Sequence, residues 1–123
     1  MIRIGIYGLG KISRRVIQGV LSSNNACLYA VCSSSIEKAN IFKKEYQAEK
    51  AYDNYERMLE DRNLDLVYIC TPNYLHTKHI QIALSYRKHV VCEKPMCVST
   101  KELNDCFDYA KRQNCFLMEA HKT

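Results

Sequence analysis

Short apolar runs alternate with longer amphipathic runs from one end of this chain to the other. The apolar runs are nearly continuous, which is typical of strands that are buried on both faces of a parallel sheet. Right-handed crossovers through the intervening helices then lead to a doubly wound arrangement. We therefore predict an α/β protein, a doubly wound Rossmann fold with a mostly parallel sheet of about six strands and helices on both faces. The expected strands are 2–7, 27–32, 50–52, 64–70, 88–93 and 115–120, and the expected helices are 12–21, 35–46, 54–61, 73–86 and 99–114.

The length and charge of the chain narrow its class further. At 123 residues it fits one domain, so we expect residues 1–123 to form a single unit. No apolar run approaches the ~20 residues of a membrane helix, and Lys11 and Arg14 interrupt the N-terminal segment before a signal peptide could form. We therefore expect a cytoplasmic protein with no membrane partner. The net charge of +5 is dispersed along the chain, which argues against nucleic acid and suits a small phosphate-bearing ligand.

Seven cysteines lie in the chain, and no two of them have C-x-x-C spacing. Most occur in apolar segments such as "YAVCS" and "VYICT", so we interpret them as small buried hydrophobic residues that stay reduced. Redox or metal chemistry is the less favoured alternative. His76 and His79 stand three residues apart, but no third ligand accompanies them, so we predict no metal site.

The segment "GLGKIS" follows the first predicted strand and opens the first predicted helix. It fits the pattern G-x-G-x-x-G with a serine in the third position. Gly8 permits the tight turn, Gly10 lets a pyrophosphate approach the main chain, and Ser13 is small enough for helix and strand to pack closely. The N–H groups and the positive dipole end of the helix then attract the phosphates. The plain alternative is a strand–turn–helix connection that needs glycines for its shape alone.

The end of the second predicted strand reads "VCSSSIEK" and carries no carboxylate before Glu37. A fold that prefers NAD usually places Asp or Glu at this point, where it binds the ribose 2′-hydroxyl. Ser33 and Ser34 can instead donate to a 2′-phosphate, and Lys38 can reach it, so the sequence favours NADP slightly over NAD. For Ser35 the better interpretation is a helix cap. In the helix that follows, we expect Ile36, Ala39, Ile41 and Phe42 to face inward.

Two further polar segments follow predicted strands at the same edge of the sheet. "TPN", from Thr71 to Asn73, stands at the mouth of the expected crevice, and Pro72 fixes a turn there. Glu93 and Lys94 open "EKP" after another buried strand. A lysine there can donate to a substrate oxygen and, if partly buried, exchange a proton with it. The alternative for this pair is a surface ion pair that merely ends a strand.

Together, "GLGKIS", "AVCSSSIEKA", "TPNYLHTKHI", "RKHVVCEKPM" and "FLMEAHKT" resemble the nucleotide-binding domain of the glucose–fructose oxidoreductase / inositol dehydrogenase (Gfo/Idh/MocA) family. The similarity covers essentially the whole chain, and "TPN…H" followed by "EKP" is its most specific part. The resemblance implies a dinucleotide-binding Rossmann domain of an oxidoreductase that uses NADP or NAD. The implied reaction is hydride transfer between the nicotinamide and a hydroxyl-bearing carbon of a sugar, inositol or small diol.

The resemblance also implies site residues. Lys94 is the catalytic candidate, because it would hydrogen-bond the reacting oxygen, and Glu93 is expected beside the nicotinamide ribose. Glu119 and His121 are expected near the nicotinamide end. The expected cofactor-binding residues are Gly8, Gly10, Lys11, Ile12, Ser33, Ser34, Lys38, Thr71, Pro72, Asn73, His76, Glu93, Lys94 and Glu119.

The chain departs from the family pattern in three ways. Arg87 stands where the family often has a glycine before "KHV", which should alter the helix cap and little else. No arginine follows the second predicted strand, which leaves the choice between NAD and NADP open. Family members also continue into a second domain for substrate binding and oligomerisation, so we expect this chain to be a piece of a longer enzyme and a poor catalyst alone. The expected partner is a small-molecule substrate, and a homo-oligomer is possible. A non-catalytic dinucleotide-sensing module is the alternative function.

Overall fold

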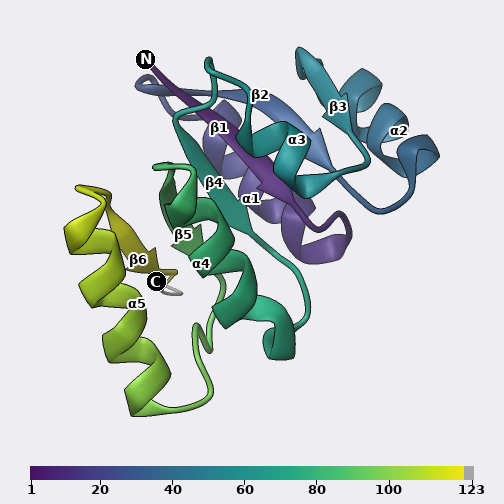
Figure 1. Ribbon diagram of the computed structural model, residues 1–123. Helices are drawn as coiled ribbons and strands as arrows, with labels where there is room; N and C mark the ends of the chain where they lie inside the picture. The colour runs from purple at the N-terminus through teal and green to yellow at the C-terminus, as the bar shows by residue number, and fades with distance from the viewer. Residues whose placement is uncertain (121–123) are drawn as a thin grey trace.

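The computed structural model describes residues 1–120, and its centre is one six-stranded sheet in the order β3-β2-β1-β4-β5-β6 (Figure 1). Every pair of neighbouring strands is parallel. The order reverses at β1, which lies between β2 and β4, and this is the doubly wound arrangement that the sequence predicts. The strands are β1 (Ile2–Tyr7), β2 (Ala26–Cys32), β3 (Lys50–Tyr52), β4 (Leu66–Ile69), β5 (His89–Cys92) and β6 (Leu117–Glu119).

Polar side chains fix the start of several helices. Ser35, Asn54 and Ser99 each accept a hydrogen bond from the N–H group three residues later, as N-cap residues do. The predicted cap at Ser35 is therefore confirmed. The helices are α1 (Lys11–Leu21), α2 (Ile36–Tyr46), α3 (Tyr55–Leu59), α4 (His76–Ser85) and α5 (Thr100–Arg112), and a 3₁₀ turn at Asn73–Leu75 precedes α4.

Two apolar cores lie on opposite faces of the sheet. Helices α1 and α2 cover one face, whereas α3, α4 and α5 cover the other (Figure 1). On the first face Ile17 and Phe42 pack with Ile6 from the central strand. On the second, Leu84 and Cys106 are fully buried in a larger core that includes Val67. The continuous apolar strands therefore bury both of their faces, as the sequence predicts.

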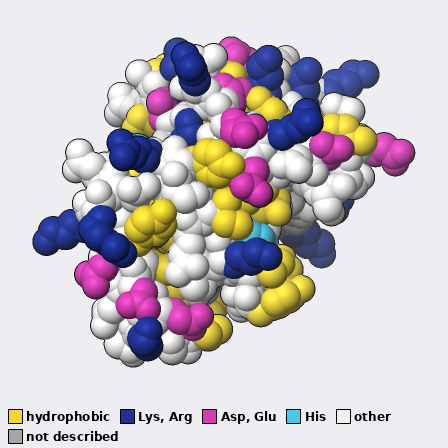
Figure 2. All heavy atoms as spheres, viewed as in Figure 1, with side chains coloured by type: hydrophobic (Ala, Val, Ile, Leu, Met, Phe, Trp, Pro, Cys, Tyr) yellow, Lys and Arg dark blue, Asp and Glu magenta, His cyan; other side chains and the backbone are white. Residues whose placement is uncertain are grey.

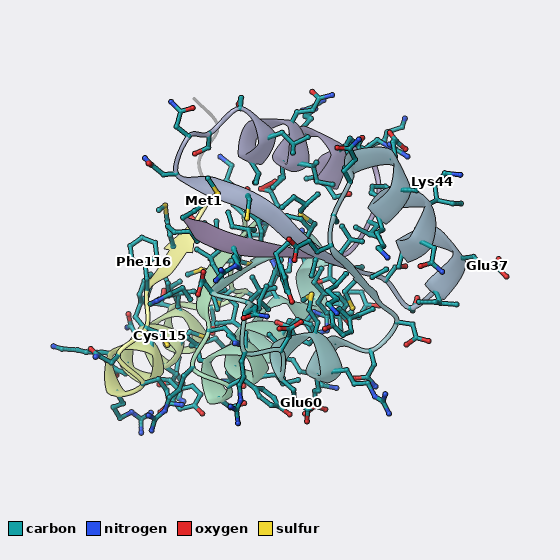
Figure 3. The ribbon with its side chains drawn as sticks, turned by 90° about the horizontal axis from the view of Figure 1, so that it is seen from above. Met1, Glu37, Lys44, Glu60, Cys115 and Phe116 are labelled. Carbon is teal, nitrogen blue, oxygen red and sulfur yellow. The ribbon has the colours of Figure 1, made fainter. Side chains whose placement is uncertain are left out.

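Two predicted inward side chains face outward. Ile41 is 60% exposed and Ile36 is 42% exposed, although the apolar pattern of α2 places both on the inner face. The buried residues of this helix are Ala39 and Phe42, which are three apart and share one side. Ile41 lies on the opposite side of the same helix. Glu37 and Lys44 also point outward from α2 (Figure 3).

Arg87 adopts the backbone conformation for which the related family often has a glycine. Its φ of 58° is in the left-handed region. The N–H of Lys88 donates to the carbonyl of Ala83 at the end of α4, at 3.2 Å, and so completes the turn into β5. The turn is thus kept, at a cost of roughly 1 kcal/mol for placing a side chain at positive φ.

Candidate functional site

A cleft of about 590 Å³ opens at the C-terminal ends of β1, β2 and β4, where the strand order reverses. Ligands of open α/β sheets bind at this point because the loops after the two neighbouring strands diverge there. The cleft takes residues from the glycine loop, the β2–α2 turn, the segment after β4 and α4. Its lining is Tyr7, Gly8, Leu9, Gly10, Lys11, Ile12, Ser13, Ser33, Ser34, Lys38, Cys70, Thr71, Pro72, Leu75 and His79.

The two glycines of the loop between β1 and α1, Gly8 and Gly10, serve different purposes. Gly8 has a φ of 94°, and its N–H donates to the carbonyl of Cys32 at 3.1 Å. A Cβ at Gly8 would lie 2.8 Å from the carbonyl carbon of Cys70, so both its conformation and its surroundings require glycine. A Cβ at Gly10 would meet no atom within 4 Å. The space beside Gly10 is therefore open to a ligand.

The start of α1 is prepared for an anion. Ser13 is buried, and its hydroxyl bonds both the N–H and the carbonyl of Gly10, at 2.6 and 2.7 Å. The first turn of α1 carries no acidic residue that would neutralise the positive end of the helix dipole. Gly10 and Lys11 thus place the helix N-terminus directly in the cleft.

The opposite end of the cleft is built by the turn between β2 and α2. Ser34 is exposed, and Ser33 is buried with its hydroxyl accepting from the N–H of Ser35 at 3.2 Å. The ammonium group of Lys38 reaches across the cleft to donate to the carbonyl of Leu9, also at 3.2 Å. No Asp or Glu lines the cleft within residues 1–120. This end therefore offers hydroxyls and a cation to a ligand.

His79 lines the cleft, although the sequence indicates it only as a possible metal ligand. Its Nδ1 lies 2.8 Å from the hydroxyl of Thr71, and its ring packs against Tyr7 with centroids 4.8 Å apart. Tyr7 in turn stacks on Tyr55 at 4.0 Å. Burial lowers the pKa of His79 to about 4, and electrostatic repulsion from the neighbouring His76 and Lys78 contributes less. The imidazole is therefore neutral at physiological pH and presents an uncharged floor.

His76 lies beneath the cleft rather than in its wall. Its side chain is fully buried. Its Nε2 is 2.7 Å from the carbonyl oxygen of Thr71, and its Nδ1 is 2.8 Å from that of Pro95. His76 thus ties the segment after β4 to the segment after β5. His76 therefore does not share the wall of this cleft, because the first turn of α4 directs its ring inward.

The segment "EKP" follows β5 and does not line the cleft. Lys94 is exposed, Glu93 is half-buried, and the peptide bond between Lys94 and Pro95 is cis. Burial and the neighbouring Glu93 raise the pKa of Tyr68. Glu119, at the end of β6, accepts from the N–H of Met96 at 2.8 Å and so fixes this segment to the edge strand.

The structure therefore divides the predicted residues into two groups. Asn73, His76, Glu93, Lys94 and Glu119 lie outside the cleft wall, and His121 lies outside the described residues. The predicted residues that do share the wall are Gly8, Gly10, Lys11, Ile12, Ser33, Ser34, Lys38, Thr71 and Pro72. The sequence does not predict Tyr7, Leu9, Cys70, Leu75 and His79 as lining residues, and it predicts Ser13 only as a packing residue. Only their position in or beside the quoted motifs could have indicated them.

The described part of the chain has neither a cluster of metal-binding side chains nor a helix that could cross a membrane. Within residues 1–120, no three side chains of His, Cys, Asp or Glu gather closely enough to hold a metal ion. No helix in that range has the length and apolar character that crossing a membrane requires. In Figure 2, Lys and Arg side chains are interspersed with Asp and Glu over the visible face.

Comparison with known proteins agrees with this geometry. A family model described as "Oxidoreductase family, NAD-binding Rossmann fold" matches residues 2–121. The NADP(+)-dependent scyllo-inositol 2-dehydrogenase of Bacillus subtilis is 36% identical over 123 residues, which are 100% of this chain and 38% of the relative. The trans-1,2-dihydrobenzene-1,2-diol dehydrogenase of Danio rerio is 33% identical over 124 residues, which cover 97% of this chain and 36% of the relative.

Solved structures share the fold at high similarity. A 3-ketoreductase from Actinomadura kijaniata, in complex with TDP-benzene and NADP and in an open conformation, matches with a TM-score of 0.91 at 29% identity. That match covers 96% of this chain and 37% of the reductase chain. The chain thus spans well under half the length of the relatives it matches. With the family model extending over nearly all of its residues, the chain belongs to the Gfo/Idh/MocA oxidoreductase family and comprises its NAD-binding Rossmann fold.

Proposed function

We propose that this chain binds a nicotinamide dinucleotide in the cleft, as the cofactor domain of an oxidoreductase that acts on CH–OH groups. The observation that carries the proposal is the glycine loop. Gly8 makes the turn that only glycine fits, and the open space at Gly10 faces the N-terminus of α1. A diphosphate placed there meets free backbone and a positive dipole end.

We infer further that the chain prefers NADP to NAD. Ser33 and Ser34 offer hydroxyls where an NAD-specific fold would carry a carboxylate. The ammonium of Lys38 already reaches into this end of the cleft. The name of the Bacillus subtilis relative and the bound cofactor of the Actinomadura kijaniata reductase are in keeping with this preference.

The substrate of the complete protein is a small molecule with a hydroxyl-bearing carbon. The relatives in the comparisons are named for inositols and for a cyclic diol. Lys94 is our candidate to hydrogen-bond the reacting oxygen, and Glu93 to bind near the nicotinamide ribose. Both lie on the segment after β5, next to the cleft but outside its wall. That position suits groups which meet the substrate and the nicotinamide end rather than the diphosphate.

Titration of the purified chain with NADPH and NADH, followed by nucleotide fluorescence, tests the cofactor site. We expect NADPH to bind more tightly.

Gly10→Ala should weaken the binding of both nucleotides at least ~10-fold, because its methyl group fills the space of the diphosphate. Lys38→Ala should weaken NADPH by about 10-fold and leave NADH nearly unchanged, since a charge-assisted hydrogen bond is lost only with the 2′-phosphate.

Gly19→Ala is the matched control for Gly10→Ala, because a Cβ at Gly19 also meets no atom within 4 Å and Gly19 does not line the cleft. It should leave both affinities unchanged. Failure of both nucleotides to bind the folded chain would refute the proposed site. Equal losses of NADPH and NADH in Lys38→Ala would refute the preference for NADP.

Lys94→Ala tests the catalytic assignment in the complete protein with a polyol or cyclic diol as substrate. We expect kcat to fall by about 100-fold or more, because the reacting oxygen loses its proton donor or acceptor. The cofactor Kd should stay within about twofold, since Lys94 lies outside the cleft wall. Lys101→Ala removes another exposed lysine and should leave kcat unchanged. Full turnover in Lys94→Ala would rule out a catalytic role.

A further inference from the structure

We propose that Cys97 and Cys106 are a redox modification site, at which a low-molecular-weight disulfide converts the two thiols into an intramolecular disulfide. Their sulfur atoms lie 3.9 Å apart. Cys97 belongs to the segment between β5 and α5, and Cys106 is on the buried side of α5. This site is separate from the cleft, because neither cysteine lines it. The proposal does not depend on the proposed function.

The two thiols differ in their exposure to solvent, and this difference gives each thiol its own role in the reaction. Cys97 is partly exposed, so a reagent in solution can reach its sulfur. Cys106 has no exposed surface. Burial, and secondly the nearby Cys97, raises the pKa of the Cys106 thiol to about 12. Cys97 therefore reacts first, and Cys106 can react only with the sulfur beside it.

The reaction proceeds in two balanced steps. Cys97 loses its proton, and its thiolate attacks one sulfur of the reagent, which forms a mixed disulfide and releases the first small thiol. Cys106 then loses its proton, and its sulfur attacks that of Cys97, which releases the second small thiol. The two protein thiols give up two electrons in all, and the reagent accepts them as its own S–S bond is broken.

Formation of the bond requires little rearrangement of the fold. The sulfur atoms must close from 3.9 Å to about 2.05 Å, which rotation of two cysteine side chains and a small shift of the loop can provide. Cys97 lies in a stretch without regular secondary structure, between β5 and the cap of α5. The same stretch is already held through Pro95 by His76 and through Met96 by Glu119. A disulfide would add a covalent tie three residues from Lys94.

Cys92 is the rival partner. It is fully buried at the end of β5, and its pKa is raised by burial and then by the nearby Cys97. The structure favours Cys106, because its sulfur is the one in contact with that of Cys97. The sequence allows the two outcomes to be separated by mass. Trypsin cuts after Lys88, Lys101 and Lys111 but not between Lys94 and Pro95, so Cys92 and Cys97 share one peptide and Cys106 lies in the next.

The test is to incubate the chain with oxidised glutathione, quench it with an alkylating agent in denaturant, and map the tryptic peptides under non-reducing conditions. We expect the number of free thiols to fall by two from the seven of the reduced chain. Peptides 89–101 and 102–111 should be found joined, and dithiothreitol should separate them. The melting temperature of the oxidised form should also be higher by roughly 5 °C or more, because the disulfide restricts the unfolded chain.

Three variants complete the test. Cys97→Ser and Cys106→Ala should each abolish the joined peptides, and Cys97→Ser should also slow the first loss of a thiol. Cys115→Ser is the matched control, since Cys115 is equally a partly exposed thiol but contacts the carbonyl of Gln113. It should still give the joined peptides.

Three results would overturn the proposal. They are a stable adduct of glutathione on Cys97 with all other thiols free, a disulfide confined to peptide 89–101, and no loss of thiols from the folded chain. All three results are read from peptide mapping of the unaltered chain, so the test does not depend on whether Cys106→Ala folds.

Discussion

Gly8→Ala should destabilise the chain by about 3 kcal/mol or more, since it combines a side chain at positive φ with overpacking against main chain. The φ of Gly8 is 94°, and the added Cβ would lie 2.8 Å from the carbonyl carbon and 2.9 Å from the oxygen of Cys70. Those atoms are backbone at the end of β4 and cannot move aside as a flexible side chain would. Thermal unfolding followed by circular dichroism should show a fall in Tm of roughly 10 °C or more.

Gly19→Ala is the control for this result. Gly19 lies within α1, and a Cβ there meets nothing within 4 Å. Alanine is the better helix former, so this variant should gain up to about 1 kcal/mol. If Gly8→Ala melts at the same temperature as the unaltered chain, Gly8 does not have a left-handed backbone conformation. The proposed geometry of the diphosphate site would then be wrong as well.

His76→Ala should destabilise the chain by roughly 3–5 kcal/mol, because it removes a hydrogen bond to a buried carbonyl and leaves a cavity. The imidazole bridges the carbonyl oxygens of Thr71 and Pro95 from a fully buried position. Carbonyl oxygens only accept, so the ring donates through a nitrogen that carries hydrogen, and the tautomer decides which carbonyl receives that bond. Urea unfolding of the purified variant, followed by fluorescence or circular dichroism, measures the loss.

His76→Gln and His89→Ala give this prediction its controls. Glutamine can donate to one of the two carbonyls and fills part of the space, so its loss should be smaller than that of alanine. His89 is exposed, and among residues 1–120 its side chain bonds only the N–H of Phe116, so its removal should cost about 1 kcal/mol. Equal stability of His76→Ala and His89→Ala would contradict the bridging role of His76.

The sequence predicts the sheet and its helices well, because each strand and helix carries its own local signal. The strand at 2–7 and the weak strand at 50–52 both occur within the predicted bounds. The placement of Ser33 and Thr71 in the cleft also follows from the sequence, since both directly follow strands that end at the same edge of the sheet. Binding of the cofactor by these residues stays a prediction.

Side-chain direction is what the sequence does not reveal. His76 and His79 are one turn apart on the same helix and equally apolar in context, yet His76 points beneath the cleft and His79 into it. Ile41 and Phe42 are adjacent and both apolar, yet only Phe42 is buried. These outcomes depend on how α2 and α4 are rotated against the sheet, and that rotation is set by packing partners far away in the chain.

The two cores differ in how much of the chain each one needs. The buried members of the core beneath α1 and α2 all lie between Ile6 and Ala48, whereas those of the opposite core extend from Tyr29 to Leu117. During synthesis, the first layer can therefore assemble once β2 and α2 have left the ribosome. The second layer must wait for β5, α5 and β6, and until then β4 has only β1 to pair with.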